Sequence, residues 1–420
     1  MPAGTLIIGT GQAGFQTAAS LRSEGYQEPI ALLGDEPHIP YQRPPLSKAF
    51  LMGKESAESI ELRPRAFYPD HNIQLLVGER AVSIEPVRRR VNLASGASLP
   101  YEKLVLAVGA RNRLLPIPGA QLDGVLYLRS LDEAAAMKQR LENAREVVVI
   151  GGGFIGLEVA AAASSLGKSA TVVEALPRLM SRVVAPAISD FFKHLHTSRD
   201  VKIKCSSAIA EIAGPHGKVS GVKLADATFL PADLVIVGIG VAPNSDLARD
   251  AGLAVANGIT VNENLQTSDE NIFAIGDCSE HPNPFAAARI RLESVQNAAD
   301  QAQHVAAQIV GRPGPYRSVP WFWTDQYDIK LQMAGISQGH DRTVTRGNPE
   351  SNTLSVFYFR QNHLLAIDSI NRPLDHMIGR KLIAAGASVT PEQAADESLD
   401  LKKLVSSVGQ HAGHSGNRPN

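Results

Sequence analysis

The feature that most constrains this chain is a glycine-rich turn between an apolar run and a helical stretch, and it occurs twice. The first glycine turn, Gly9–Gly14, reads Gly-Thr-Gly-Gln-Ala-Gly and follows Thr5–Ile8. The second glycine turn, Gly151–Gly156, reads Gly-Gly-Gly-Phe-Ile-Gly and follows a Val/Ile run that ends at Ile150. The helical stretches run from Phe15 to Ser23 and from about Leu157 to Leu166, and each leads into another apolar strand that ends at an acid. This order is typical of a dinucleotide-binding βαβ unit, so the sequence predicts two separate Rossmann-type domains.

The glycines of such a turn have separate uses. The first allows a tight turn, the second lets the backbone approach a pyrophosphate, and the third lets the helix pack on the strand. The helix N-terminus then offers free amides and a partial positive charge to the phosphates. The alternative is a turn in an α/β protein that binds no nucleotide. In this chain the three positions are Gly9, Gly11 and Gly14 in the first turn, and Gly151, Gly153 and Gly156 in the second.

The acid at the end of the second strand discriminates between ligands. Such a carboxylate accepts hydrogen bonds from ribose hydroxyls and repels a 2′-phosphate. Glu174 occupies this position in the second unit and predicts NADH over NADPH, although Arg178 lies four residues further on and would weaken the preference. Asp35 in the first unit suits the adenosine ribose of another dinucleotide.

A later segment indicates that the first dinucleotide is FAD. The run Thr267–Cys278 ends in Gly276-Asp277, which places an acid after a strand and before a helix. Here the chain resembles the two-dinucleotide flavoprotein superfamily, in which such a Gly-Asp pair binds the ribityl hydroxyls. The order of both glycine turns and this pair carries the resemblance.

Four further segments narrow the resemblance to the FAD-dependent, oxygenase-coupled NADH–ferredoxin reductases. They are Arg43–Lys48, Gly156–Glu158, Glu293–Ala298 and Pro320–Tyr327, and the similarity extends from Leu6 to about Leu404. The resemblance implies that NADH gives a hydride to FAD. FAD then passes single electrons to a small [2Fe–2S] ferredoxin, which serves a cytochrome P450 or a ring-hydroxylating oxygenase.

The resemblance also implies a set of site residues. Ala81 is smaller than the family's usual residue, and Gln296 stands where proline is common. The FAD site would comprise Gly9, Gly11, Ala13, Gly14, Asp35, Lys48, Ala81, Arg129, Gly276, Asp277, Val295 and Trp323, and the NAD site Gly151, Gly153, Ile155, Gly156, Glu158, Glu174 and Gly240.

Lys48 and Glu158 are the candidate catalytic residues. A cation near the flavin stabilises negative charge on the reduced ring, and Glu158 would either pair with Lys48 or contact the nicotinamide. The alternative is that both are surface residues of helices, the usual location of such side chains. For Trp321 and Trp323 the alternative is a place in the core of the third domain.

The motifs predict an α/β protein with an inserted domain and an appended one. The FAD-binding domain would comprise 1–110 and 245–317, with the NAD-binding domain, 111–244, inserted within it. Short alternating segments at Thr353–Phe359 and Leu364–Ile370 predict antiparallel strands in a C-terminal α+β domain, 318–405. The last residues, 406–420, are rich in Gly, His, Ser and Asn and predict a disordered tail.

Charge and cysteine content exclude several other classes. The net charge of −1 gives no global field for nucleic acid or a membrane surface. No segment has a signal-peptide pattern or about 18 uncharged apolar residues, so we expect a cytoplasmic protein. The only cysteines, Cys205 and Cys278, form no CxxC motif, which argues against a metal site and a dithiol centre.

Two alternative functions remain open at this point. One is an NADH oxidase, peroxidase or disulfide reductase, which usually needs a redox cysteine near the flavin. The other is an NADH-sensing flavoprotein of the apoptosis-inducing-factor type, which would oxidise NADH slowly. For the ferredoxin reading we expect a basic docking patch contributed by Arg289, Arg291, Arg312, Arg317 and Lys330.

Overall fold

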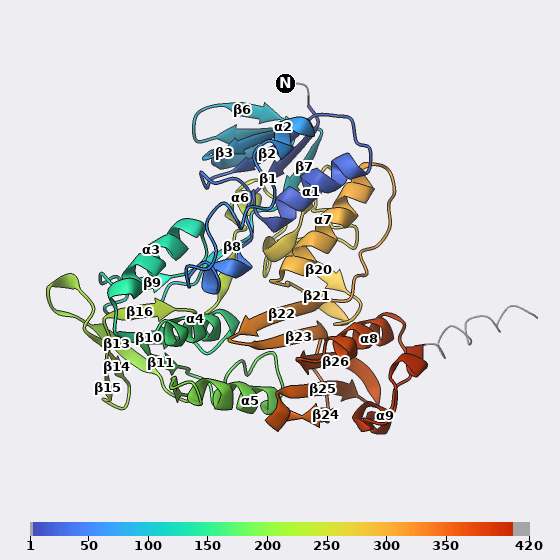
Figure 1. The fold of residues 1–420 in the computed structure, drawn as a ribbon. Coiled ribbons are helices and arrows are strands. Elements are labelled where there is room, and N and C mark those ends of the chain that lie inside the picture. The colour runs from blue at the N-terminus through green and yellow to red at the C-terminus, as the bar shows by residue number, and fades with distance from the viewer. Residues whose placement is uncertain (1–2, 406–420) are drawn as a thin grey trace, which may run out of the picture. The chain divides into compact units, whose positions relative to one another are not determined.

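The computed structural model describes residues 3–405 and groups them into two compact units (Figure 1). The predicted disordered tail, 406–420, lies outside the described residues. Unit 1 contains the described residues up to Arg43, together with Glu55–Arg111 and Val241–Ser318. Unit 2 contains Pro44–Lys54, Asn112–Gly240 and the described residues from Val319 onward.

Unit 1 is built on a parallel five-stranded sheet of order β19-β7-β1-β2-β3. The central strands are continuous apolar runs because both faces of the sheet are covered, and Ile7 and Leu32 are fully buried. Helices α1 and α7 pack side by side in this unit (Figure 1). The bounds are β1 Thr5–Ile8, β2 Ile30–Gly34, β3 Ile73–Val77, β7 Lys103–Leu106, β19 Ile272–Ala274, α1 Gln12–Ser23 and α7 Val295–Ile309.

Smaller elements complete unit 1. Two three-stranded sheets, β4-β5-β6 and β18-β20-β21, are separate from the parallel sheet, because their strands do not pair with its strands. The bounds are α2 Phe67–Asp70, β4 Ala81–Glu85, β5 Arg90–Leu93, β6 Ser98–Pro100, β17 Val241–Pro243, α6 Asp246–Asp250, β18 Ile259–Thr260, the 3₁₀ turn η3 Gly276–Cys278, β20 Ser279–Asn283 and β21 Ala288–Ile290. The short strand β8, Ala110–Asn112, spans the point where the chain leaves unit 1 for unit 2.

Unit 2 repeats the parallel architecture with the order β12-β11-β10-β16-β9. Helix α4 follows β10 through the second glycine turn, and its alanine-rich middle is buried. A capping box at Ser130 starts α3. The bounds are β9 Val125–Tyr127, α3 Leu131–Asn143, β10 Glu146–Ile150, α4 Phe154–Ser165, β11 Ser169–Val173, α5 Pro186–Thr197, β12 Lys202–Lys204 and β16 Leu234–Val237.

Antiparallel sheets make up the rest of unit 2. The larger has the order β22-β23-β26-β25-β24, and α8 packs on β26 and β23. The two antiparallel strands predicted from the alternation correspond to β25 and β26. The bounds are η1 Pro44–Ser47, β13 Ile209–Ala213, η2 Pro215–Gly217, β14 Gly221–Leu224, β15 Phe229–Pro231, β22 Trp321–Gln326, β23 Ile329–Gly335, β24 Arg342–Asn348, η4 Pro349–Ser351, β25 Thr353–Arg360, β26 His363–Ile370, α8 Pro373–Ala384 and α9 Pro391–Ala395.

Both helices that follow the glycine turns begin earlier than their apolar pattern indicated. The sequence predicted helical residues from Phe15 and from Leu157, whereas α1 begins at Gln12 and α4 at Phe154. Each helix therefore starts inside its glycine turn, with its first amides at the turn. Across residues 3–405, no helix has both the length and the apolar character needed to cross a membrane.

Candidate functional site

The first glycine turn has the close backbone approaches that its three glycines predict. Gly9 has a φ of 115°, and a Cβ there would lie 2.1 Å from the Ala107 carbonyl oxygen. A Cβ on Gly14 would lie 1.8 Å from the Gly9 carbonyl oxygen. Gly11 is different, because a Cβ there would meet no protein atom within 4 Å. The space in front of Gly11, the N-cap of α1, is therefore open to a phosphate group.

The Gly276-Asp277 pair lies beside the first glycine turn, although more than 250 residues separate the two in sequence. Strand β19 pairs with β7, and β7 pairs with β1, so all three carboxyl ends meet at one edge of the sheet. Gly276 has a φ of 72°, and a Cβ there would lie 3.3 Å from the Ala13 side chain. Its amide donates to Gln301 Oε1 at 2.7 Å. The structure thus brings the first turn and the Gly-Asp pair together.

The acid at the end of β2 is part of a cluster that sequence reasoning missed. Asp35 is exposed at the same sheet edge, and the next residue, Glu36, accepts hydrogen bonds from Tyr41 and Arg43, each at 2.5 Å. The Arg43 guanidinium also interacts electrostatically with Asp277. Arg43 fell within a segment noticed by resemblance, but no spacing or periodicity marks it as the link between these acids.

Two other predicted FAD residues lie elsewhere in unit 1. Val295 is the first residue of α7, whose N-cap Ser294 accepts a hydrogen bond from the Asn297 amide at 3.0 Å. Ala81 begins β4, in a separate three-stranded sheet. The open helix N-terminus, the close glycines and the Gly-Asp pair fit a dinucleotide that reaches from a pyrophosphate to a polyol.

The second glycine turn has the same geometry within unit 2. Gly151 has a φ of 107°, and a Cβ there would lie 2.4 Å from the Gly238 carbonyl oxygen. A Cβ on Gly156 would lie 2.1 Å from the Gly151 carbonyl oxygen, whereas one on Gly153 would meet nothing within 4 Å. This turn also fits a dinucleotide, with its open face at the N-cap of α4.

Glu174 is tied directly to the second glycine turn. Its Oε2 accepts from the Gly152 amide at 2.7 Å, and its Oε1 accepts from the Leu176 amide at 2.8 Å. The Arg178 guanidinium donates instead to the carbonyls of Val184 and Ser181 and to Ser189 Oγ, at 2.6–2.8 Å. These hydrogen bonds hold the Arg178 guanidinium against residues 181–189. Arg178 therefore does not neutralise Glu174 through an ion pair in this structure.

Lys48 and Glu158 form an ion pair within unit 2. Lys48 Nζ lies 2.8 Å from Glu158 Oε2, and the side chains are 18% and 5% exposed. Glu158 Oε2 also accepts from Ser47 Oγ at 2.5 Å, while Oε1 accepts from Thr324 Oγ1 at 2.6 Å. Lys48 further donates to the Pro44 carbonyl at 3.2 Å. The alternative that Glu158 is a surface residue is wrong, and pairing with Lys48 is one of the two predicted contacts.

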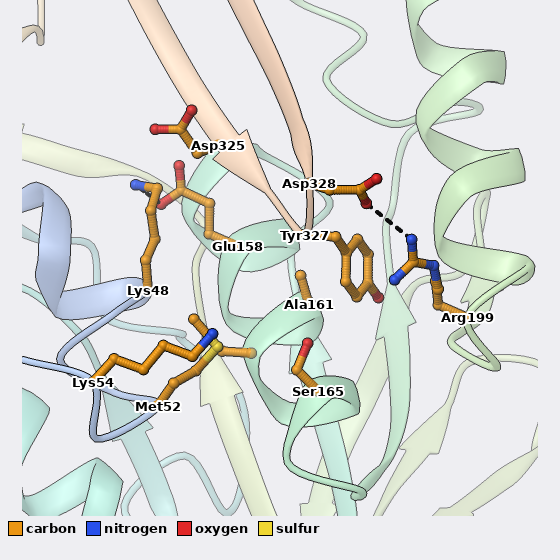
Figure 2. A pocket seen from close by; sticks show the side chains of 11 residues that line it. Lys48, Met52, Lys54, Glu158, Ala161, Ser165, Arg199, Asp325, Tyr327 and Asp328 are labelled. Atoms are coloured by element: carbon orange, nitrogen blue, oxygen red, sulfur yellow. Dashed lines mark hydrogen bonds and ion pairs between the residues drawn. The ribbon is translucent and has the colours of Figure 1, made fainter. Parts of the chain in front are cut away.

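The ion pair lines a cavity of about 360 Å³ (Figure 2). Three cations and three carboxylates are among the lining residues, so the lining has no net excess of one charge. Figure 2 shows Asp325 above the Lys48–Glu158 pair and Tyr327 beside Ala161. Arg199 pairs with Asp328 at 2.9 Å on the far side. The lining residues are Lys48, Met52, Lys54, Glu158, Ala161, Ala162, Ser165, Arg199, Asp325, Tyr327 and Asp328.

The remaining predicted site residues of unit 2 lie on or beside α4, β9, β16 and β22. Ile155, in the first turn of α4, is 44% exposed. Arg129 follows the edge strand β9, and its amide donates to Glu133 at 2.7 Å. Gly240, with a φ of 100°, follows β16 and accepts from the Arg113 amide at 3.0 Å. Trp323 is half-buried on β22, with its ring centroid 5.6 Å from that of Trp321.

The cysteines do not form a redox centre. Cys205 and Cys278 are both free, and burial raises the pKa of the Cys278 thiol to about 12. A thiol with such a pKa stays protonated near neutral pH and is a poor nucleophile. Among residues 3–405, no group of three or more His, Cys, Asp and Glu side chains is arranged to hold a metal ion.

The cations expected to form a docking patch are mostly neutralised by neighbouring carboxylates. Arg291 lies 2.6 Å from Glu293 and is 8% exposed, and Lys330 lies 3.6 Å from Asp325. Four of the five predicted cations therefore have acidic partners, which weakens any long-range field they create. The four pairs are Arg289–Glu280, Arg291–Glu293, Arg312–Glu24 and Lys330–Asp325.

Comparison with known proteins connects these sites to a family. Residues 4–302 match the pyridine nucleotide-disulphide oxidoreductase family, and residues 321–405 match the reductase C-terminal family. The rhodocoxin reductase of Rhodococcus erythropolis is 50% identical over 400 residues, which cover 95% of this chain and 94% of the relative.

Two solved structures share the whole fold. The ferredoxin reductase for the CYP199A2 system of Rhodopseudomonas palustris has a TM-score of 0.94 and 48% identity, covering 96% of this chain and 100% of that one. The covalent putidaredoxin reductase–putidaredoxin complex contains a chain with a TM-score of 0.94 and 41% identity, covering 97% of this chain and 99% of that one.

This chain belongs to the FAD-dependent ferredoxin reductase family. It is an oxidoreductase with two Rossmann-type domains and a C-terminal domain, and the predicted fold class is confirmed. FAD and NAD(H) are the cofactors of this family, which confirms the cofactor prediction.

Proposed function

We propose that this protein transfers electrons from NADH to a small [2Fe–2S] ferredoxin that serves a cytochrome P450 or a ring-hydroxylating oxygenase. One observation carries the proposal: there are two separate dinucleotide turns, and the two cysteines of the sequence, Cys205 and Cys278, are both free and lie more than 70 residues apart. Electrons that enter from NADH must therefore leave to an acceptor outside the chain. In the solved complex, the partner of the putidaredoxin reductase is putidaredoxin, a separate protein, which supports an acceptor outside the chain.

Each glycine turn would hold one dinucleotide. The first turn, with Asp35 and Asp277, would bind FAD, and the second, with Glu174, would bind NADH. FAD bound at the first turn would supply the redox chemistry, which is uptake of a hydride from NADH and release of the two electrons singly to an acceptor. The domain boundaries at 110, 245 and 318 remain part of this proposal.

Lys48 and Glu158 would control the charge near the reacting rings. The Glu158 carboxylate holds the Lys48 ammonium at 2.8 Å, and Ser47 and the Pro44 carbonyl limit where both groups can move. A fixed ammonium stabilises a nearby negative charge better than a mobile one, because no reorganisation is needed. We therefore assign Lys48 as the cation of the FAD site and Glu158 as the residue on the nicotinamide side.

The geometry of Glu174 supports NADH as the donor. Both of its oxygens accept backbone hydrogen bonds, so the carboxylate is fixed where a ribose would bind, and Arg178 is held elsewhere by the loop at 181–189. A fixed, unneutralised carboxylate repels a 2′-phosphate. We also propose that the reaction takes place in the cytoplasm, where NADH is available and cysteines stay reduced.

Stopped-flow reduction tests this function. The FAD-loaded protein is mixed with NADH and then with a series of purified [2Fe–2S] ferredoxins, and the bleaching of flavin and of cluster absorbance is followed separately. Rapid reduction by NADH followed by multiple turnovers with at least one ferredoxin is the expected result. Slow oxidation of NADH with no ferredoxin turnover would favour a sensing role, and turnover with oxygen or peroxide alone would favour an oxidase or peroxidase.

A further inference from the structure

A chain of buried hydrogen bonds leads away from Glu158 into the interior of unit 2. Thr324 Oγ1 donates to Glu158 Oε1 at 2.6 Å, and Gln326 Nε2 donates to Thr324 Oγ1 at 3.3 Å. The Gln326 Oε1 atom lies 2.8 Å from His196 Nε2. The Tyr327 hydroxyl lies 3.4 Å from the other ring nitrogen, His196 Nδ1. Helices α4 and α5 and the β22–β23 hairpin are joined by this chain.

The strand period places these groups together. Thr324 and Gln326 are two residues apart on β22 and therefore point to the same face. Thr324 and His196 are 0% exposed and Gln326 is 1% exposed. A buried amide, hydroxyl or imidazole without a partner is costly, so the donors and acceptors of these three side chains must match one another.

The direction of the chain depends on which nitrogen of His196 carries the hydrogen. If Nε2 carries it, Nε2 donates to the Gln326 carbonyl, and the Gln326 amide nitrogen donates to Thr324. The hydroxyl of Thr324 then has its own hydrogen free for Glu158. If Nδ1 carries the hydrogen, Nε2 becomes an acceptor and the Gln326 amide must turn around. Thr324 would then donate to the Gln326 carbonyl, and Glu158 Oε1 would lose its hydrogen bond.

We propose that His196 is a positioning residue for Glu158, acting through Gln326 and Thr324 to aim the Thr324 hydroxyl hydrogen at Glu158 Oε1. With Oε1 occupied in this way, the carboxylate presents Oε2 to Ser47 and Lys48. In this tautomer Nδ1 can accept a hydrogen bond from the Tyr327 hydroxyl, which lies 3.4 Å away. The chain orients groups and carries no proton, because an amide such as Gln326 cannot readily pass one on.

The ring of His196 must be uncharged for this role. Burial lowers the pKa of His196, and the hydrogen bond with Gln326 opposes that effect only in part. A neutral ring has one donor and one acceptor, which is the combination that gives the chain a single direction. The inference rests on the proposed function only where it assigns Glu158 to the reaction with NADH.

The first test is spectroscopic and needs no turnover. The FAD-loaded protein is labelled with ¹⁵N-histidine and ¹³C-glutamate, and the signals of His196 and Glu158 are assigned by their loss in His196→Phe and Glu158→Gln. We expect the Nε2–H tautomer at His196. We also expect the Glu158 carboxyl signal to move in the same direction in His196→Phe, Gln326→Met and Thr324→Val. Thr324→Ser, which keeps the hydroxyl, should leave the Glu158 signal in place. Thr171→Val should do the same, because Thr171 is a buried threonine on β11 that takes no part in these hydrogen bonds.

The second test separates the positioning role from the proposed function. Single-turnover reduction by NADH should slow roughly three- to tenfold in His196→Phe and Gln326→Met, with Thr324→Ser restoring the rate lost in Thr324→Val. Two results would overturn the positioning role. One is an Nδ1–H tautomer at His196, and the other is a Glu158 carboxyl signal that is unchanged in both His196→Phe and Gln326→Met. If Glu158→Gln is reduced at the wild-type rate, the assignment of Glu158 in the proposed function is wrong, and the carboxyl signal still decides the positioning role.

Discussion

The backbone amide of Gly152 donates to Glu174 Oε2 at 2.7 Å, so the acid that ends β11 is anchored to the turn that ends β10. A Cβ on Gly152 would lie 3.1 Å from this same oxygen and 2.7 Å from Leu179, so the turn and the acid are closely packed. The part of the site that would bind phosphate and the part that would select the ribose are therefore one structural element.

Replacing Glu174 should alter the choice of coenzyme. Glu174→Ala removes an acceptor and a charge, and a hydrogen bond to a charged group contributes about 1.5–3 kcal/mol, so kcat/KM for NADH should fall roughly ten- to a hundredfold. The difference between kcat/KM for NADH and kcat/KM for NADPH should become smaller. Glu174→Gln, which keeps the shape, should narrow the gap with a smaller loss for NADH. Steady-state kinetics with both coenzymes measure this, and a wild-type preference for NADPH would contradict it.

Two glycines allow binding to be tested without disturbing the fold. A methyl group at Gly11 or Gly153 would meet no protein atom within 4 Å. We expect Gly11→Ala to keep the melting temperature of the apoprotein but to lose FAD affinity, since the methyl would occupy the approach to the pyrophosphate. Gly153→Ala should keep FAD and weaken NADH. Gly314→Ala, also in open space, is the matched control. Equal FAD and NADH affinities in all three variants would refute both turn assignments.

The Lys48–Glu158 pair should show energetic coupling. Lys48→Met leaves a carboxylate that is 5% exposed without its ammonium, and breaking a buried pair from one side is strongly destabilising. Because Lys48 retains some exposure, we expect a loss of about 1–3 kcal/mol in the free energy of unfolding. The double variant with Glu158→Gln should lose less than the sum of the single variants. Urea unfolding with saturating FAD measures the cycle, and strict additivity would show that the two groups are independent.

Because of Asp368, in the antiparallel sheet, we expect the free energy of unfolding to depend on pH. This aspartate is buried on β26, accepts a hydrogen bond from the Tyr358 hydroxyl, and has its pKa raised by burial to about 7. An unfolded aspartate titrates near 3.9, so between these values the folded state binds more protons and stability falls as pH rises. Asp368→Asn should remove this decline. Relative to wild type, it should gain about 1–3 kcal/mol between pH 5 and pH 8. A constant difference across that range would contradict the prediction.

Local motifs were sufficient to predict the two parallel sheets. Each glycine turn follows an apolar strand, and the Val/Ile run at β10 allows little other than a strand covered on both faces. Helix starts were placed late because the hydrophobic pattern begins only after the first turn of each helix. The first turn is set by backbone amides, which leave no apolar signal.

The contacts of individual charged side chains could not be predicted in the same way. Lys48 and Glu158 were singled out by resemblance, but their pairing depends on a helical turn at 44–47 that carries no periodic pattern. The partners of Arg289 and Arg312 are set by tertiary packing, so a count of basic residues overestimated the available charge. The contact between Glu36 and Arg43 was missed because the two residues meet across a loop.

The strand order of unit 1 has a consequence for synthesis of the chain. Strand β19 completes the parallel sheet beside β7, although the residues of the whole second Rossmann unit separate them in sequence. During translation, the other four strands of the sheet leave the ribosome first, with the edge of β7 unpaired. The second Rossmann sheet lacks only β16 until residue 237 and can assemble first. The proposed FAD site would be complete only after Asp277 has emerged, so we expect cofactor loading to be a late event in the biogenesis of this protein.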